Sequence, residues 1–579
     1  MADYRGVHVI HDAPAAMRDG VVLRADIYRP ESEGAFPVLL QRTPYNKRFA
    51  QSAVYQHPAW YARQGYIVAV QDVRGRFASD GDFVPYLHEA EDGYDSIGWA
   101  ASLPGSSGKV GTYGFSYAGA CQILAAACSP SNLAATAIGM AGTSFNDGWT
   151  YRGGALQLAF ILSWTIQALA PPQAIRSGQD RLMERLRELG ANLNDAYRRP
   201  LGSWIDSGEL PAFFEDWVRQ EGAGEYWERL SRPMPSGKPV PNLYIGGWYD
   251  IFLSGTLAAY SASAHSLTRG RSPEQRLVVG PWQHVPWASL NGSVSYGSSG
   301  NNNADSLQLS WFDKHLKGKS QTEAQSPVSY FLMGANEWRR CEQWPPEGAR
   351  TTEYFLRSDG RANSLSGTGT LSEIAPVSEP PDLYVYDPSE PVPSVGGASC
   401  CRADVAPVGA FDQRHVEIRN DVLVYTSPVL DKDVDVVGPV ELVIFAATDA
   451  PDTDWTAKLV DVHPDGKAIN ICDGIIRARF RNPAEPPSNI EPGQIYEYRI
   501  DLGATANRFL RGHAIRLEVS SSNFPAYDVN DNTGATITSR NPNKVRIATQ
   551  AVFHDAERCS RLRLSLLGPA KSETTTTKQ

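Results

Sequence analysis

Ser116 stands in a segment whose residue types suit a nucleophilic serine. The run 110–119 reads VGTYGFSYAG, so Gly114 lies two residues before Ser116 and Ala118 lies two residues after it. In a nucleophile elbow the serine occupies a strained turn between a strand and a helix, and small neighbours let the two backbones approach. Ala118 replaces the usual glycine but is small enough. The alternative is a glycine-flanked serine in an ordinary loop, which the predicted strand before the turn and helix after it disfavour.

A serine nucleophile needs a histidine base that is held by a carboxylate, in the chain order serine, acid, histidine. His284 follows a predicted strand and turn, LVVGPWQH, and Asp250 follows another, LYIGGWYD. Either could instead be a structural loop residue, but together they predict a triad of Ser116, Asp250 and His284. The other histidines precede the serine (His8, His11, His57, His88), fall in helical stretches (His265, His315) or fall in the β-rich C-terminal region (His415, His463, His513, His554).

The residue after the nucleophile has its own expected part in the chemistry. In an elbow its backbone N–H points at the oxyanion that forms during acyl transfer, and the helix dipole adds to the stabilisation. The sequence therefore predicts that the N–H of Tyr117 belongs to an oxyanion hole.

The elements that must position these residues alternate between strands and helices. Residues 21–28, 37–42, 66–72 and 109–114 read as strands, and residues 88–103 and 118–128 as helices, which is typical of a doubly wound α/β sheet. From about 146 to 240 helical patterns dominate, at 154–170, 179–189 and 211–220; strands resume at 241–246 and 276–280. We expect an α/β-hydrolase domain over 1–145 and 241–351 with a helical cap, 146–240, over its ligand end; the alternative is a helical decoration elsewhere.

The C-terminal part has a different texture. Short β-rich runs separated by Gly, Pro and Asp turns occur at 422–425, 440–446, 456–462, 495–502, 514–520 and 562–567. They predict an all-β sandwich over 352–570, followed by a disordered tail, 571–579.

Composition and charge narrow the class of protein. The 579 residues are 42% hydrophobic and carry a net charge of −10 without a basic run, which argues against nucleic acid as a partner. No apolar run approaches a membrane span, and the N-terminus lacks a signal-peptide pattern. The seven cysteines show no metal-ligand spacing, so we expect a cytoplasmic, reduced protein without a metal or other cofactor. The sequence leaves the oligomeric state open, a homodimer included.

Three other motifs have structural explanations. The adjacent Cys400 and Cys401 are predicted to be two buried thiols rather than a vicinal disulfide. The stretch 528–534, DVNDNTG, resembles a calcium loop, but its glycine is one position late and no glutamate follows, so a turn is predicted. The basic run Arg74-Gly75-Arg76 is predicted to be a structural loop rather than an anion site.

Several longer segments together resemble one family. The hydrolase part contains the segments MRDGVVLRADIYRP, TPYNK, QDVRGRFASDGDF, GFSYAG, GGWYD and GPWQH. The β-rich part contains DTDWTAKLVDVHPDGKA and SSSNFPAYDVN. They resemble the bacterial cocaine esterase group of serine hydrolases and, more distantly, α-amino-acid ester hydrolases and X-prolyl dipeptidyl peptidases. The resemblance implies an α/β-hydrolase domain with an inserted helical cap and a C-terminal jelly roll.

The resemblance also implies roles that residue spacing does not reveal. Tyr45 of TPYNK matches the tyrosine whose hydroxyl completes the oxyanion hole, and Trp149 and Trp164 match cap tryptophans that line the acyl pocket. Cys400 and Cys401 fall where cocaine esterase has larger apolar pocket residues, so cocaine itself is not a secure substrate. Asp147 could supply one member of an ammonium-binding carboxylate cluster, which is otherwise not identifiable.

The predicted activity is hydrolysis of small-molecule carboxylic esters, of small to aromatic acyl groups, through an acyl-enzyme. The same triad would serve an amide or peptide hydrolase, such as an aminopeptidase, β-lactam acylase or amidase. A carbohydrate-binding protein with an inert hydrolase domain is the alternative outside enzymes, and it predicts a broken triad.

Overall fold

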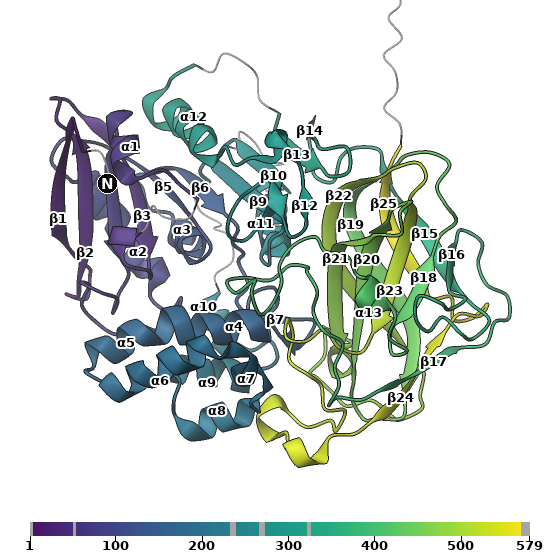
Figure 1. Cartoon of the computed structure of the whole chain (residues 1–579). Coiled ribbons are helices and arrows are strands. Elements are labelled where there is room, and N and C mark those ends of the chain that lie inside the picture. The colour runs from purple at the N-terminus through teal and green to yellow at the C-terminus, as the bar shows by residue number, and fades with distance from the viewer. Residues whose placement is uncertain (1–3, 50–53, 232–238, 266–272, 321–325, 569–579) are drawn as a thin grey trace, which may run out of the picture.

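The computed structural model describes residues 4–49, 54–231, 239–265, 273–320 and 326–568. Within these residues the chain forms an α/β part, a helical segment and an all-β part, which Figure 1 shows with the helical segment beside both of the others. The predicted disordered tail, 571–579, lies outside the described residues.

The first part is built on a ten-stranded sheet with the order β1-β2-β4-β3-β5-β6-β9-β10-β13-β14. The central pairs from β4 to β13 are parallel, whereas β1, β2 and β14 join antiparallel at the edges. The strands are β1 (Val7–Ala16), β2 (Val22–Pro30), β3 (Phe36–Thr43), β4 (Ile67–Asp72), β5 (Ser106–Phe115), β6 (Leu133–Gly139), β9 (Asn242–Tyr249), β10 (Gln275–Gln283), β13 (Val328–Leu332) and β14 (Glu337–Cys341).

Helices cover both faces of this sheet because its central strands are apolar on both sides. In β3, Leu39 packs on the cluster that includes Trp311 of α12, whereas Val38 and Leu40 pack with Ile97 of α2 on the opposite face. This alternation is the period-two pattern of a fully buried strand. The helices are α1 (Pro58–Arg63), α2 (Glu89–Ala101), α3 (Tyr117–Ala127), α11 (Leu253–His265) and α12 (Ala304–Lys317); the short elements are η1 (Lys47–Phe49), β11 (Leu290–Asn291), β12 (Val294–Ser295) and η4 (Ser298–Gly300).

The helical segment is inserted between β6 and β9. It begins with a small hairpin, β7 (Tyr151–Arg152) and β8 (Ala155–Leu156), so the first helix starts at Leu158 and not at the expected residue 154. The helices are α4 (Leu158–Trp164), the π-helical turn η2 (Thr165–Leu169), α5 (Ala170–Arg176), α6 (Asp180–Ala191), α7 (Leu193–Arg198), α8 (Leu201–Ser207), α9 (Ala212–Arg219) and α10 (Glu225–Leu230).

One stretch of the helical segment departs from the expectation that no run could span a membrane. The continuous helical residues Leu158–Arg176 are long and apolar enough by length and composition. However, 67% of their most apolar window is buried inside the protein, which is typical of a core helix.

The all-β part is mainly antiparallel, with the long strand β19 pairing with β22, β24 and β25. Its first strand, β15, begins at Ala349, shortly before the predicted boundary, because it pairs along its length with β25. The elements are β15 (Ala349–Arg357), β16 (Thr370–Ser372), β17 (Asp382–Tyr386), α13 (Arg414–Glu417), β18 (Leu423–Thr426), β19 (Val434–Thr448), β20 (Asp454–Val462), β21 (Ala468–Arg477), η5 (Ala478–Phe480), β22 (Tyr496–Phe509), β23 (Ala514–Ser520), η6 (Ile537–Ser539), η7 (Pro542–Lys544), β24 (Ala548–Phe553) and β25 (Arg561–Leu567).

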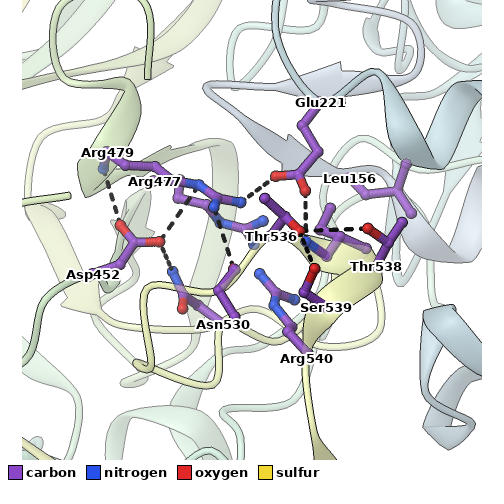
Figure 2. A network of polar contacts seen from close by, with 12 residues as sticks. Leu156, Glu221, Asp452, Arg477, Arg479, Asn530, Thr536, Thr538, Ser539 and Arg540 are labelled. Atoms are coloured by element: carbon purple, nitrogen blue, oxygen red, sulfur yellow. Dashed lines mark hydrogen bonds and ion pairs between the residues drawn. The ribbon is translucent and has the colours of Figure 1, made fainter. Parts of the chain in front are cut away.

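A buried ionic network joins the helical segment to the all-β part (Figure 2). Glu221, which follows α9, pairs with Arg479 and accepts the backbone N–H of Ile537. Nearby, Arg477 pairs with both Asp454 and Asp528 at 2.9 and 3.0 Å. In the segment 528–534, which resembled a calcium loop, the first carboxylate is therefore engaged in an ion pair.

Candidate active site

Ser116 lies at the turn between β5 and α3, in the geometry of a nucleophile elbow. Its backbone angles are φ 60° and ψ −128°, a strained conformation for a residue other than glycine. A Cβ at Gly114 would lie 2.7 Å from the Ala118 Cβ, and one at Gly119 would lie 2.7 Å from the Gly139 carbonyl oxygen. The small residues that predicted the elbow are therefore sterically required.

The predicted triad is assembled. His284 Nε2 lies 3.0 Å from Ser116 Oγ, and His284 Nδ1 lies 2.7 Å from Asp250 Oδ1. Asp250 follows β9 and His284 follows β10, so two adjacent parallel strands deliver the two side chains to the same edge of the sheet. All three residues are buried. This arrangement lets the imidazole accept the serine proton while the carboxylate fixes its tautomer.

Two aromatic side chains and an indole hold the histidine in place. The rings of Phe115 and Phe252 lie 5.7 and 5.0 Å from the His284 ring, and the Phe252 contact is edge-on. Trp287 Nε1 donates a hydrogen bond to the His284 carbonyl oxygen. Phe115 and Phe252 each stand within two residues of Ser116 or Asp250, but their contact with His284 has no signal in the sequence.

Tyr45, to which the family resemblance assigns part of the oxyanion hole, lies beside Ser116. Its hydroxyl contacts the Ser116 side chain and accepts a hydrogen bond of 3.0 Å from Trp164 Nε1 of α4. Burial raises the pKa of Tyr45 above its ordinary value, so the hydroxyl keeps its proton. A neutral phenol that already accepts from an indole can direct its own O–H at an oxyanion.

Tyr117 begins α3, where a backbone N–H has no acceptor within the helix. Its side chain points away from this task, because the hydroxyl donates to Glu89 Oε1 at 2.9 Å and accepts from the Tyr86 N–H. Arg42 pairs with Glu89 at 2.8 Å, so a buried ion pair supports the first residue of the helix that follows Ser116.

The cap tryptophans, Trp149 and Trp164, add to the aromatic side chains around His284. Trp149 stacks on Phe252 with ring centroids 3.9 Å apart and lies 6.5 Å from the Trp164 ring. Among the described residues the Trp149 Nε1 and the Tyr86 hydroxyl are buried without a hydrogen-bond partner. Asp147 was a candidate member of an ammonium-binding cluster. Its carboxylate accepts the Gly153 N–H and so stabilises a local turn.

Arg76, predicted to be structural, connects the loop that carries Tyr45 to the cap. Its guanidinium donates to the carbonyl oxygens of Pro44, Leu169 and Ala168 at 3.0, 2.8 and 2.8 Å. Burial lowers the pKa of Arg76 to about 10. The neighbouring Arg74 pairs with Asp92 and Asp19. The contacts of both arginines agree with a structural loop.

The prediction of two buried thiols at Cys400 and Cys401 is wrong. The two residues form a vicinal disulfide, with Cys400 buried and Cys401 exposed. The loop that holds them is fixed on both sides, because Arg402 donates to the Gly190 carbonyl of the cap and the Ala410 carbonyl accepts the Ser293 N–H. In the described part of the chain no hydrogen bond or ring contact links the pair to the triad, so its place in the substrate pocket stays a prediction.

A fold of this type with a strained serine, a histidine and a carboxylate in hydrogen-bonded order defines a serine hydrolase of the α/β-hydrolase type. Comparison with known proteins agrees with this class. The model of the X-Pro dipeptidyl-peptidase family S15 matches residues 19–286, and that of the X-Pro dipeptidyl-peptidase C-terminal non-catalytic domain matches residues 320–563.

The chain belongs to the cocaine esterase family of serine hydrolases. It is 38% identical over 567 residues to the cocaine esterase of Rhodococcus sp. (strain MB1 Bresler), covering 95% of this chain and 97% of that protein. Two solved structures share the fold at 24% identity: an aminopeptidase from a marine sediment Thaumarchaeota archaeon (TM-score 0.81, 98% and 97% of the two chains) and an α-amino acid ester hydrolase (TM-score 0.79, 98% of each).

Proposed function

We propose that Ser116 is the nucleophile with which this esterase forms an acyl-enzyme, that His284 is its general base and that Asp250 orients the imidazole. The observation that carries the proposal is the pair of hydrogen bonds of 3.0 and 2.7 Å that joins the three side chains in this order. Their burial adds support, because electrostatic interactions are stronger where water is excluded.

The reaction follows from these roles. His284 removes the Ser116 proton as the oxygen attacks the ester carbonyl, and the imidazolium then protonates the leaving alcohol. A water molecule then gives a proton to His284 as its oxygen attacks the acyl carbonyl, and the imidazolium returns that proton to Ser116 Oγ as the acid leaves. The Tyr45 hydroxyl and the Tyr117 N–H stabilise the oxyanion in both halves. Loss of one such donor costs roughly 10²–10³-fold in kcat.

The acyl group is proposed to be short or aromatic. Support comes from the aromatic side chains that surround the triad, among them Trp149, Trp164 and Phe252. Apolar and aromatic walls favour apolar acyl groups, and an unpaired indole N–H such as Trp149 Nε1 offers one directional contact to a polar atom.

The nucleophile is tested by labelling with a fluorophosphonate probe. Ser116→Ala should lose both labelling and esterase turnover while its circular dichroism and thermal midpoint stay those of the wild type. A matched substitution of the exposed Ser131 to alanine should change neither. Labelling that persists in Ser116→Ala would refute the assignment.

Pairs of an ester and an amide with the same acyl group test whether the protein prefers ester or amide substrates. We expect p-nitrophenyl esters of short and aromatic acids to be cleaved much faster than the corresponding anilides, with or without a free α-amino group. Faster cleavage of α-amino anilides would favour a peptidase of the same family. The cytoplasmic location and the homodimer stay predictions.

A further inference from the structure

Three side chains with metal-ligating groups meet at one end of the all-β part. Asp461, His463 and His513 each offer one ligand atom, and these atoms all lie within 4.8 Å of one another. No other group of three or more His, Cys, Asp or Glu side chains among the described residues is arranged in this way. The triad uses none of them.

The strand register explains why the three side chains share one face. β20 and β23 pair antiparallel, with Val462 opposite Ala514 and Asp461 opposite Ile515. The same register places His463 opposite His513 just beyond the ladder, and their ring centroids are 4.4 Å apart. Because side chains alternate along a strand, Asp461 points to the same face as His463. The sheet thus presents two imidazoles and a carboxylate together.

The contacts within the cluster match the spacing of metal ligands. Asp461 Oδ2 lies 3.9 Å from His463 Nε2, a distance that two ligands at about 2.0–2.2 Å from one ion can span. Asp461 Oδ1 lies 2.8 Å from His513 Nδ1, so the carboxylate already orients one imidazole. The backbone holds both histidines, because the His463 N–H donates to the Lys467 carbonyl and the His513 carbonyl accepts the Leu430 N–H.

Burial and charge suit a cation that enters from solvent. The side chains of Asp461 and His513 are 8% and 9% exposed, whereas that of His463 is 37% exposed, so the cluster is closed behind and open on one side. The further charges around it are Asp433, Asp465 and Lys467, and Lys467 pairs with Asp465 at 3.3 Å. Asp433 lies 3.9 Å from Arg508, so both outer carboxylates have a cation beside them and Asp461 supplies the negative charge of the cluster itself.

We propose that Asp461, His463 and His513 bind one divalent transition-metal ion of the zinc type, with solvent completing its coordination. Two imidazoles and one carboxylate favour Zn²⁺, Co²⁺ or Ni²⁺ over Mg²⁺ and Ca²⁺, which prefer oxygen ligands alone. The ion clamps the end of β20 to the turn before β23. Its role is structural, and ester hydrolysis does not require it.

The experiment uses the full chain without a histidine tag, stripped of metal by a chelator and titrated with ZnCl₂ by calorimetry. We expect one equivalent of tight binding, a raised thermal midpoint and no response to MgCl₂. His463→Ala should weaken binding by more than the roughly 10–100-fold that the loss of an outer-shell partner costs. His415→Ala removes an exposed histidine of the same part of the chain and should leave binding unchanged.

A spectroscopic measurement keeps the test independent of stability. Co²⁺ bound by two imidazoles and a carboxylate gives visible absorption bands that His463→Ala and Asp461→Asn should each abolish, while esterase turnover stays at the wild-type level. His463→Ala decides if Asp461→Asn does not fold, because the His463 side chain is the most exposed of the three. Zinc binding that is equal in wild type and His463→Ala, or absent up to about 1 mM, would overturn the proposal.

Discussion

Trp164 Nε1 of the cap donates a hydrogen bond of 3.0 Å to the Tyr45 hydroxyl of the hydrolase domain. The cap therefore contacts Tyr45 directly. It fixes which way the Tyr45 hydroxyl points, because an oxygen that accepts from the indole has its own hydrogen free for the Ser116 side.

Trp164→Phe should lower kcat more than it changes KM. The substitution keeps an aromatic ring but removes the donor, and one hydrogen bond of about 1 kcal/mol corresponds to roughly a fivefold loss in rate. The measurement is steady-state hydrolysis of an acetyl ester, whose small acyl group makes little use of the pocket. Tyr45→Phe should cost more, roughly 10²–10³-fold.

The double variant shows whether Trp164 acts through Tyr45. If it does, Trp164→Phe should cost little once Tyr45 is phenylalanine, so the two effects should not add. Full additivity of the two free energies of activation would contradict the relationship.

Tyr45 should remain a proton donor far into the alkaline range. Burial raises the pKa of Tyr45, and an acid whose folded pKa is raised keeps its proton until the pH passes that higher value. Any stability this neutral form contributes is likewise lost only as pH rises through the raised pKa. We therefore expect kcat to stay level between about pH 8 and pH 10, where an ordinary tyrosine would ionise. A fall near pH 10 that is absent from Tyr45→Phe would contradict this.

Arg76→Lys should destabilise the protein and lower kcat together. Pro172 has no N–H to donate to the Ala168 carbonyl in the preceding turn, and Arg76 supplies that missing hydrogen bond. A lysine cannot reach three carbonyls at once, so we expect a loss of about 3 kcal/mol in the free energy of unfolding. Because Arg76 also holds Pro44, which precedes Tyr45, the oxyanion hole should loosen.

Urea unfolding, monitored by two independent signals, measures the loss in the free energy of unfolding of Arg76→Lys. Arg18→Lys is the control, because Arg18 pairs with Asp95 at the surface and its side chain is 54% exposed. That variant should change the free energy of unfolding by less than about 0.5 kcal/mol. Equal stability and turnover in the two lysine variants would show that Arg76 does not connect the domains.

The sequence could predict that Ser116, Asp250 and His284 meet because each of them carries a local signal. Ser116 is flanked by small residues, and Asp250 and His284 each end an apolar run that reads as a buried strand. Parallel strands bring such ends to one edge of the sheet, so chain order and strand ends together are enough. Helical periodicity replaces strand signals from about residue 146, so the same reasoning predicted a helical insertion there.

The contacts between distant segments could not be predicted in this way. Trp164 and Tyr45 are 119 residues apart, and Arg76 reaches carbonyls 92 and 93 residues away. Cys401 of the vicinal disulfide has φ 81°, a conformation that is uncommon for a residue other than glycine and that the sequence does not predict. Likewise His463 and His513 are cross-strand neighbours only once the register of β20 and β23 is known.

Glu221→Gln should weaken the junction between the cap and the all-β part. The side chains of Glu221 and Arg479 are 10% and 6% exposed, and Figure 2 shows them at the edge of a larger buried network. Removing the carboxylate charge leaves Arg479 with Asp452, whose oxygen lies 3.7 Å away, as its remaining counter-ion. Breaking one side of a buried pair typically costs about 3–5 kcal/mol, so we expect a lower thermal midpoint and faster hydrogen exchange in α9.

The exposed pair of Glu215 and Arg219 supplies the control, since Glu215→Gln should change stability by less than about 0.5 kcal/mol. Because a buried pair is poorly screened, the difference between the two variants should persist in 1 M salt; its disappearance there would show that the Glu221 pair behaves as a surface ion pair.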